Sequence, residues 1–194
     1  MKPLAYTLPY AWLFWGVVLF AYLPEFALVT RSRPAPDEKA DRGSMKVIML
    51  GGWVGMGGAF AAAGIRAFTI TRGQKTWFFA GLVTLLCGSL LRRHCWHMLG
   101  KHFTGDVKAS ADQPVIERGV YRWVRHPSYT GGMLMYLGTG LALTNWLSAL
   151  IITSAGATAY LYRVRVEEQA LQANLGPRYT EYMRRTKRFV PFVF

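Results

Sequence analysis

The sequence has few acidic residues and few cysteines. Ten Asp and Glu stand against 23 Lys and Arg in 194 residues, and Cys87 and Cys95 are the two cysteines. Two cysteines near the end of one predicted helix give no disulfide framework. The net charge of +13 would suit a nucleic-acid-binding protein. Because no nucleic-acid recognition motif accompanies this charge, we expect no nucleic acid partner.

Charge is absent altogether from four long stretches, residues 3–24, 47–65, 76–91 and 126–162. The first two contain 22 and 19 residues, close to the roughly 20 that cross about 30 Å of hydrocarbon as a helix. The third contains 16 residues, and we expect the charges of the flanking Lys75, Arg92 and Arg93 to reach the membrane interface. These three stretches are predicted transmembrane helices.

The fourth stretch is too long for one crossing, because 37 residues at about 1.5 Å each would form a helix of roughly 55 Å. Residues 144–148 combine helix-stop and N-cap chemistry. We therefore predict two short helices, residues 127–143 and 147–162, which form a hairpin. The predicted fold class is an all-α integral membrane protein with about five transmembrane helices, of which spans four and five are the hairpin.

The positive charges are distributed unevenly between the two sides of the predicted membrane. Nineteen of the 23 Lys and Arg lie in the loop of residues 30–46, within residues 92–125, or from residue 163 onwards. This asymmetry follows the positive-inside rule and predicts that these segments are cytoplasmic. The tail, residues 163–194, begins as an amphipathic helix that we expect on the membrane surface.

The second predicted span is rich in small residues. Gly51 and Gly55 form a GxxxG pair, and such spacing lets helix backbones approach closely within lipid. Packing within the chain is favoured over dimerisation, because five helices already supply each other with partners. No chemistry is assigned to residues 30–46, the loop before this span.

Residues 119–132 contain the densest polar cluster. Pro127 can occupy the first turn of a helix, since that position needs no amide donor. Arg125 and His126 then lie just before the helix, where they and the free helix amides would suit a carboxylate. The alternative is simple interfacial anchoring by Tyr, Trp and Arg.

Glu167 and Glu168 directly follow the fifth predicted span. The hairpin returns them to the membrane side where Arg125 and His126 lie, so the two sets are predicted to face each other. The alternative is an intrahelical ion pair between Arg163 and Glu167, worth about 0.5 kcal/mol. His94, Cys95 and His97 lack a carboxylate or a second ligand pair at metal-site spacing, so no metal site is predicted.

These residues carry a family resemblance. The pattern G-x-Y-R-x-x-R-H-P-x-Y-x-G from Gly119 precedes the apolar hairpin, and R-x-x-x-E-E-x-x-L follows it from Arg163. Then come L-G-x-x-Y-x-x-Y from Leu175 and R-x-x-P-F from Arg188. Over residues 90–194 the chain resembles the isoprenylcysteine carboxyl methyltransferase family and its phospholipid methyltransferase relatives. The resemblance implies an integral membrane enzyme that moves a methyl group from S-adenosylmethionine to a lipophilic or lipidated acceptor.

The resemblance also implies site residues. The residues that would bind the cofactor are Gly119, Tyr121, Arg125, His126, Pro127, Tyr129, Gly131, Glu167 and Glu168. Glu167, Glu168 and Arg163 would act in catalysis. Arg163 or Arg184 would hold an acceptor carboxylate, and Arg163 is favoured because it lies closer to the hairpin. Lys101 and His102 are weaker candidates for cofactor contact. Residues 1–75 would form a scaffold of two transmembrane helices with a cytoplasmic loop, and residues 76–194 the membrane-embedded methyltransferase core.

Other activities remain alternatives. A carboxylate acceptor is ionised at neutral pH, whereas a phospholipid amine must lose a proton, with which a glutamate could assist. Small-thiol S-methylation is a third possibility. Membrane sterol reductases that use NADPH have a similar R-H-P-x-Y-x-G signature. No basic pocket for a 2′-phosphate is assigned from the sequence, so the methyltransferase interpretation is favoured.

Overall fold

The computed structural model describes residues 2–31, 41–100 and 114–191, and within these ranges the chain is helical without a named strand. The long helices are α1 (Tyr10–Arg31), α3 (Ser44–Ala63), α4 (Gln74–Leu99), α5 (Pro127–Ala142), α6 (Trp146–Leu175) and α7 (Pro177–Arg185). Short 3-10 turns are η1 (Leu4–Tyr6), η2 (Arg66–Phe68) and η4 (Gly119–Arg122). The predicted all-α class is confirmed. Three helices, α1, α3 and α4, are long and apolar enough to cross a membrane.

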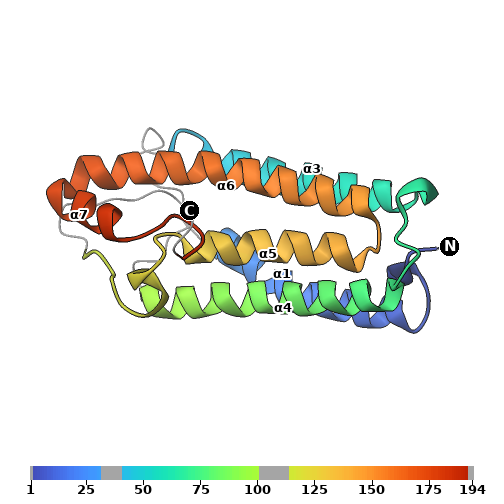
Figure 1. Ribbon diagram of the computed structural model, residues 1–194. Coiled ribbons are helices and arrows are strands. Elements are labelled where there is room, and N and C mark those ends of the chain that lie inside the picture. The colour runs from blue at the N-terminus through green and yellow to red at the C-terminus, as the bar shows by residue number, and fades with distance from the viewer. Residues whose placement is uncertain (1, 32–40, 101–113, 192–194) are drawn as a thin grey trace.

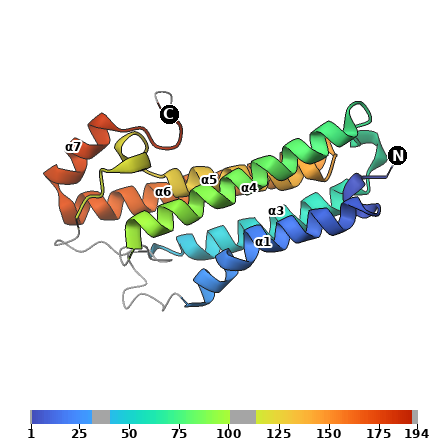
Figure 2. The same cartoon turned by 90° about the horizontal axis from the view of Figure 1, so that it is seen from below.

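The long helices form an elongated bundle in two layers. Figure 2 shows α1 and α3 side by side below α4, α5 and α6. The closest pairs are α4 with α5 and α3 with α6, and the hairpin partners α5 and α6 join the two pairs. Helix α7 and the C-terminal segment cover one end of the bundle (Figure 1). This end carries the polar cluster described below.

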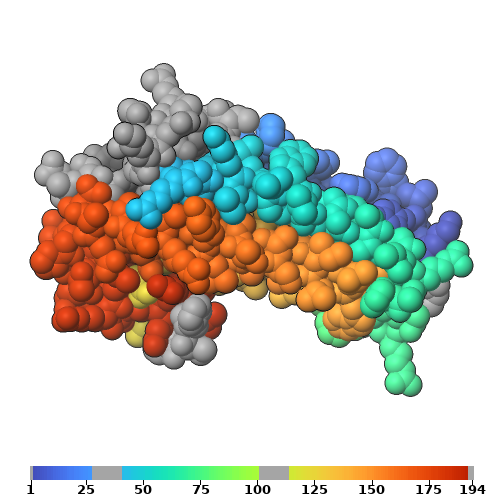
Figure 3. Space-filling view, turned by 90° about the horizontal axis from the view of Figure 1, so that it is seen from above, coloured from blue at the N-terminus to red at the C-terminus, as the bar shows by residue number. Residues whose placement is uncertain are grey.

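Glycines allow the close helix contacts. A Cβ on Gly81 of α4 would lie 2.3 Å from the amide nitrogen of Ala142, and one on Gly138 of α5 would lie 2.3 Å from that of Leu85. On α3, the GxxxG pair packs against α6, where a Cβ on Gly55 would lie 2.9 Å from the Cβ of Ala155. The space-filling view shows α3 and α6 in continuous contact (Figure 3). The expected packing within the chain is confirmed.

The helix boundaries agree with the sequence signals at the hairpin. Helix α5 begins at Pro127, as predicted. Asn145 is the N-cap of α6, and its side chain accepts a hydrogen bond from the amide of Ser148 at 3.0 Å. Helix α6, however, continues to Leu175, because residues 163–175 contain no glycine or proline that would end it before Gly176. The first part of the predicted tail helix is therefore the end of α6.

Arg92, whose charge we expected to reach the membrane interface, is buried inside the helical bundle. Arg92 is only 8% exposed, and its guanidinium donates to both carboxylate oxygens of Glu25, at 2.5 and 2.6 Å. Helix α1 runs through Pro24 to Arg31, which brings the Glu25 carboxylate opposite Arg92 on α4. Arg93, in contrast, is partly exposed, and its guanidinium lies over the ring of Phe20, 4.2 Å from the ring centroid.

Candidate functional site

The two halves of the predicted site meet at the α7 end of the bundle. Arg125 and His126 precede α5, while Glu167 and Glu168 lie on α6, about 40 residues later in the chain. Arg125 Nε donates to Glu168 Oε1 at 2.9 Å. The hydroxyl of Tyr129 donates to Glu167 Oε2 at 2.7 Å. The prediction that these sets face each other is confirmed.

Glu168 is the centre of a buried ion-pair cluster. The residue is 3% exposed, and its Oε1 lies 3.3 Å from Nε2 of His126. Its Oε2 lies 3.0 Å from Nε and 2.9 Å from Nη2 of Arg188. Burial opposes ionisation of this carboxyl, but hydrogen bonds from His126, Arg188 and Arg125 outweigh it and lower the pKa of Glu168 to about 2. Glu168 is therefore an ionised anchor that joins α5, α6 and the C-terminal segment.

Glu167 has a different environment. It is partly exposed, and its hydrogen bond to Tyr129 links it to Arg163, whose Nε donates to the Tyr129 hydroxyl at 3.3 Å. The guanidinium of Arg163 forms its ion pair with Asp41, and Nη1 also donates to the hydroxyl of Ser44 at 2.7 Å. Tyr129 thus connects Arg163 to Glu167 instead of the intrahelical ion pair considered from the sequence.

The C-terminal segment pairs with the chain before α5 through backbone hydrogen bonds. The amide of Arg125 donates to the carbonyl of Lys187 at 2.8 Å, and that of His126 to the carbonyl of Arg188 at 3.0 Å. In return, the Lys187 amide donates to the carbonyl of Trp123 at 3.0 Å. The amides of Tyr129 and Thr130 both donate to the carbonyl of His126. The expectation of free helix amides is therefore wrong for Tyr129 and Thr130, since the His126 carbonyl accepts from both.

The remaining predicted residues support this arrangement. Tyr121 is buried, its carbonyl accepts from the Tyr182 hydroxyl at 2.7 Å, and burial, together with Cys95 and Glu167 nearby, raises the pKa of the Tyr121 phenol. Gly119 has φ +59°, which favours glycine. A Cβ on Gly131 would lie 2.7 Å from Cγ of Arg92, so this glycine permits close packing of α5 on α4. A left-handed backbone conformation at Gly119 and close helix packing at Gly131 thus explain why glycine occupies these two positions.

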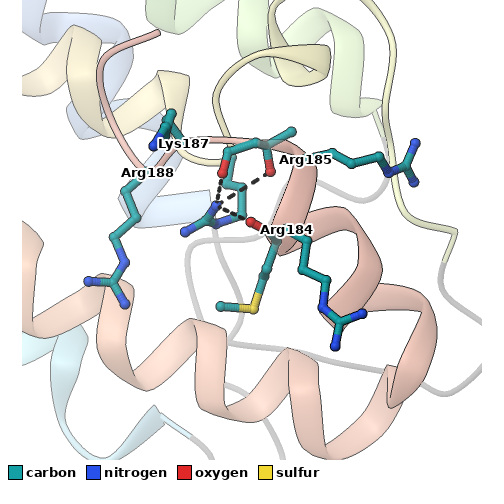
Figure 4. A pocket seen from close by; sticks show the side chains of 7 residues that line it. Arg184, Arg185, Lys187 and Arg188 are labelled. Atoms are coloured by element: carbon teal, nitrogen blue, oxygen red, sulfur yellow. Dashed lines mark hydrogen bonds between the residues drawn. The ribbon is translucent and has the colours of Figure 1, made fainter. Parts of the chain in front are cut away.

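A groove of about 330 Å³ adjoins this cluster, lined by Arg125 and residues 183–188. Its size is at the lower end of small-molecule sites. Figure 4 shows Arg184, Arg185, Lys187 and Arg188 extending from it in different directions. Three hydrogen bonds in the same view join Arg125 Nη1 to the carbonyls of residues 183 and 186 and to the Thr186 hydroxyl. The groove is strongly cationic and suits an anionic group.

Sequence reasoning missed several residues that build the site. Asp41 and Ser44 fall in the loop to which no chemistry was assigned, although an Asp three residues before a Ser at the start of an apolar run is a helix-start signal. Arg188 was noted only as part of a motif. Glu25 had no signal other than its place beside Pro24 at the end of the first uncharged stretch. Lys101 and His102 lie outside the described residues.

Comparisons with known proteins are consistent with this geometry. Residues 81–173 match the model of the isoprenylcysteine carboxyl methyltransferase family. The chain is 32% identical over 124 residues to protein-S-isoprenylcysteine O-methyltransferase B of Arabidopsis thaliana, covering 62% of this chain and 63% of that protein. The Saccharomyces cerevisiae protein-S-isoprenylcysteine O-methyltransferase is 30% identical over 137 residues, which cover 70% of this chain and 57% of the relative.

A solved structure has the same fold. The eukaryotic intramembrane Ras methyltransferase ICMT superposes with a TM-score of 0.60 and 26% identity, covering 76% of this chain and 52% of that one. The chain thus spans less than two thirds of the length of each of these three proteins. The family model covers α5, most of α4 and nearly all of α6, which include Arg125, His126 and both glutamates. The resemblance inferred from the motifs is therefore confirmed: residues 81–173 match the isoprenylcysteine carboxyl methyltransferase family, and the chain shares the fold of a solved member.

Proposed function

We propose that the protein is an integral membrane methyltransferase that uses S-adenosylmethionine to methylate a lipophilic acceptor, with the carboxylate of a prenylated cysteine as the favoured acceptor. The observation that carries this proposal is the junction of Arg125 and His126 with Glu168, and of Tyr129 with Glu167, at one end of the helical hairpin. These residues lie within the segment that matches the family model. The named activities of the relatives support the reaction type.

The charges of the site fit this cofactor. Glu167 is partly exposed and is the carboxylate that we assign to the ammonium group or the ribose hydroxyls of the cofactor. The His126 ring and the cations of the groove suit its carboxylate. We assign Glu168 to positioning, because Arg125, His126 and Arg188 already surround it. The bound cofactor supplies an activated methyl group.

An acceptor carboxylate needs alignment and exclusion of water but no general base, because it is already ionised. Two arginines were proposed from the sequence to hold it. Arg163 is 2% exposed and bonded to Asp41, whereas the Arg184 side chain is 76% exposed and lines the groove. This difference in exposure favours Arg184 for contact with an acceptor and assigns Arg163 to positioning.

We further propose five membrane spans with the site on the cytoplasmic side. Helices α5 and α6 carry the uncharged stretch 126–162, which supports spans four and five. The α5 helix of 16 residues would extend about 24 Å, so the bilayer must be locally thin around it. The excess of Lys and Arg at the α7 end supports its cytoplasmic location.

The cationic groove is one observation that favours the alternative, an NADPH-dependent reductase, because a 2′-phosphate would be attracted to it. Calorimetric titration of detergent-purified, monodisperse protein distinguishes the two functions. We expect micromolar binding of S-adenosylhomocysteine and no binding of NADPH. Binding of NADPH alone would replace the methyltransferase proposal. Glu167→Ala is expected to lose S-adenosylhomocysteine binding, while Gln169→Ala, an exposed neighbour on α6, retains it.

The acceptor class is tested by methyl transfer from labelled S-adenosylmethionine in membranes. The experiment compares three acceptors: an N-acetylated prenylcysteine, phosphatidylethanolamine and a small alkyl thiol. We expect label in the prenylcysteine as a base-labile methyl ester. Label on the lipid amine or on the thiol would assign the reaction to the other methyltransferase alternatives.

A further inference from the structure

Four side chains from three helical segments form a continuous polar chain. Asp41, just before α3, binds the guanidinium of Arg163 on α6. Arg163 Nε donates to the hydroxyl of Tyr129 on α5 at 3.3 Å. Tyr129 then donates to Glu167 Oε2 at 2.7 Å. The chain therefore connects the start of α3 with the glutamate that we assign to the cofactor.

The direction of each hydrogen bond in this chain is determined. An arginine guanidinium can only donate, so the Tyr129 oxygen accepts from Arg163. The single hydroxyl proton of Tyr129 is then directed to Glu167. Glu167 is consequently held through Oε2, and its orientation depends on the position of Arg163.

Asp41 determines the position of Arg163. Arg163 is almost completely buried, and a buried guanidinium without a carboxylate partner is strongly unfavourable. Asp41 is itself fixed, because it accepts hydrogen bonds from the Ser44 hydroxyl at 2.9 Å and from the Met45 amide at 3.1 Å. A carboxylate is also favoured at a helix N-terminus. Asp41 is thus a rigid anchor for the chain.

We propose that Asp41 is a positioning residue for the cofactor site and acts on Glu167 through Arg163 and Tyr129. The proposal rests on the proposed function, in which Glu167 binds the cofactor. Asp41 lies outside residues 81–173, which the family model matches. The α1–α3 half of the chain, interpreted from sequence as a scaffold, therefore contributes to the site.

A double-mutant cycle on S-adenosylhomocysteine affinity tests this chain. Asp41→Asn and Tyr129→Phe are each expected to weaken binding about tenfold, a size typical of coupled neighbours. In the Tyr129→Phe background, Asp41→Asn should add less than about twofold, because the chain is already broken. Gln169→Ala is the matched control, since it removes the 2.8 Å bond from Arg42 that docks the same segment on α6. This control should bind normally.

The proposal would be overturned if folded Asp41→Asn bound S-adenosylhomocysteine with wild-type affinity. It would also be overturned if the affinity loss of the double variant equalled the product of the two single losses. If the wild-type protein bound no S-adenosylhomocysteine, the proposed function would fail instead. In that case the stability losses of the same single and double variants are measured by thermal unfolding in detergent. Non-additive losses between Asp41 and Tyr129, with additive losses between Gln169→Ala and Tyr129→Phe, support the chain. Additive losses in both pairs refute it.

Discussion

Both carboxylate oxygens of Glu25 accept hydrogen bonds from the guanidinium of Arg92, at 2.5 and 2.6 Å. Nη1 of Arg92 also donates to the carbonyl of Ser128 in the first turn of α5, at 3.0 Å. The ion pair therefore joins α1, α4 and α5. Its contact with α5 lies two residues after His126 in the chain. Such a bidentate pair is strong and geometrically specific.

Glu25→Ala is expected to destabilise the protein by about 3 kcal/mol or more, because it leaves the buried Arg92 charge without a partner. The measurement is thermal unfolding in detergent. The double variant Glu25→Leu/Arg92→Met should recover most of the loss, since an apolar pair needs no compensation. A double variant no more stable than Glu25→Ala would contradict this account of the pair.

The ion-pair cluster at Glu168 predicts a pH dependence. The pKa of Glu168 is lowered to about 2 from a usual value of 4.5, so its stabilising contribution is complete above pH 4.5 and is lost as the pH falls towards 2. Glu168→Gln keeps the shape but removes the charge. The unfolding temperature of the wild type should exceed that of Glu168→Gln by a constant amount above pH 4.5, and the gap should narrow below it. A gap independent of pH throughout would show that the charge contributes nothing.

The sequence predicted those features that local chemistry determines. Uncharged stretches identify apolar helices, Pro127 marks the start of α5, and residues 144–148 mark the hairpin turn. The hairpin also predicted that Glu167 and Glu168 would meet the Arg125–His126 segment. Each of these inferences needs only helix length, capping and the return of the chain.

Contacts between distant segments were not predictable in the same way. Nothing local indicates that Glu25 is opposite Arg92, or that Asp41 reaches Arg163, since both depend on how α1 and α3 pack on the other helices. The pairing of residues 187 and 188 with the amides of Arg125 and His126 likewise has no sequence signature. Packing across the bundle thus determines the polar partners.

The contact between α4 and α5 predicts that small side chains are required there. Gly138→Ala would place a Cβ 2.3 Å from the Leu85 amide nitrogen and 2.6 Å from the Gly81 carbonyl oxygen. The helices must separate, at a cost of about 1–3 kcal/mol or more. Gly57→Ala is the matched control, because its new Cβ meets nothing within 4 Å. Thermal unfolding in detergent should show a loss for Gly138→Ala alone, and equal stability of the two variants would refute the contact.

The backbone pairing of the C-terminal segment predicts a selective effect of proline at residue 187. Lys187→Pro removes the amide that donates to the Trp123 carbonyl at 3.0 Å. Thr186 has φ −123° and ψ 157°, an extended conformation compatible with a following proline. The variant therefore loses a hydrogen bond without strain at the preceding residue.

Loss of this bond should release the segment from α5 and expose the amides of Arg125 and His126, which donate to the carbonyls of residues 187 and 188. We expect faster hydrogen exchange at these two amides and weaker binding of S-adenosylhomocysteine, because Arg188 would also leave Glu168. Lys187→Ala keeps the backbone amide and removes only the charge, so it should exchange like the wild type. If Lys187→Ala accelerated exchange as much as Lys187→Pro, the side chain and not the backbone pairing would hold the segment on the site.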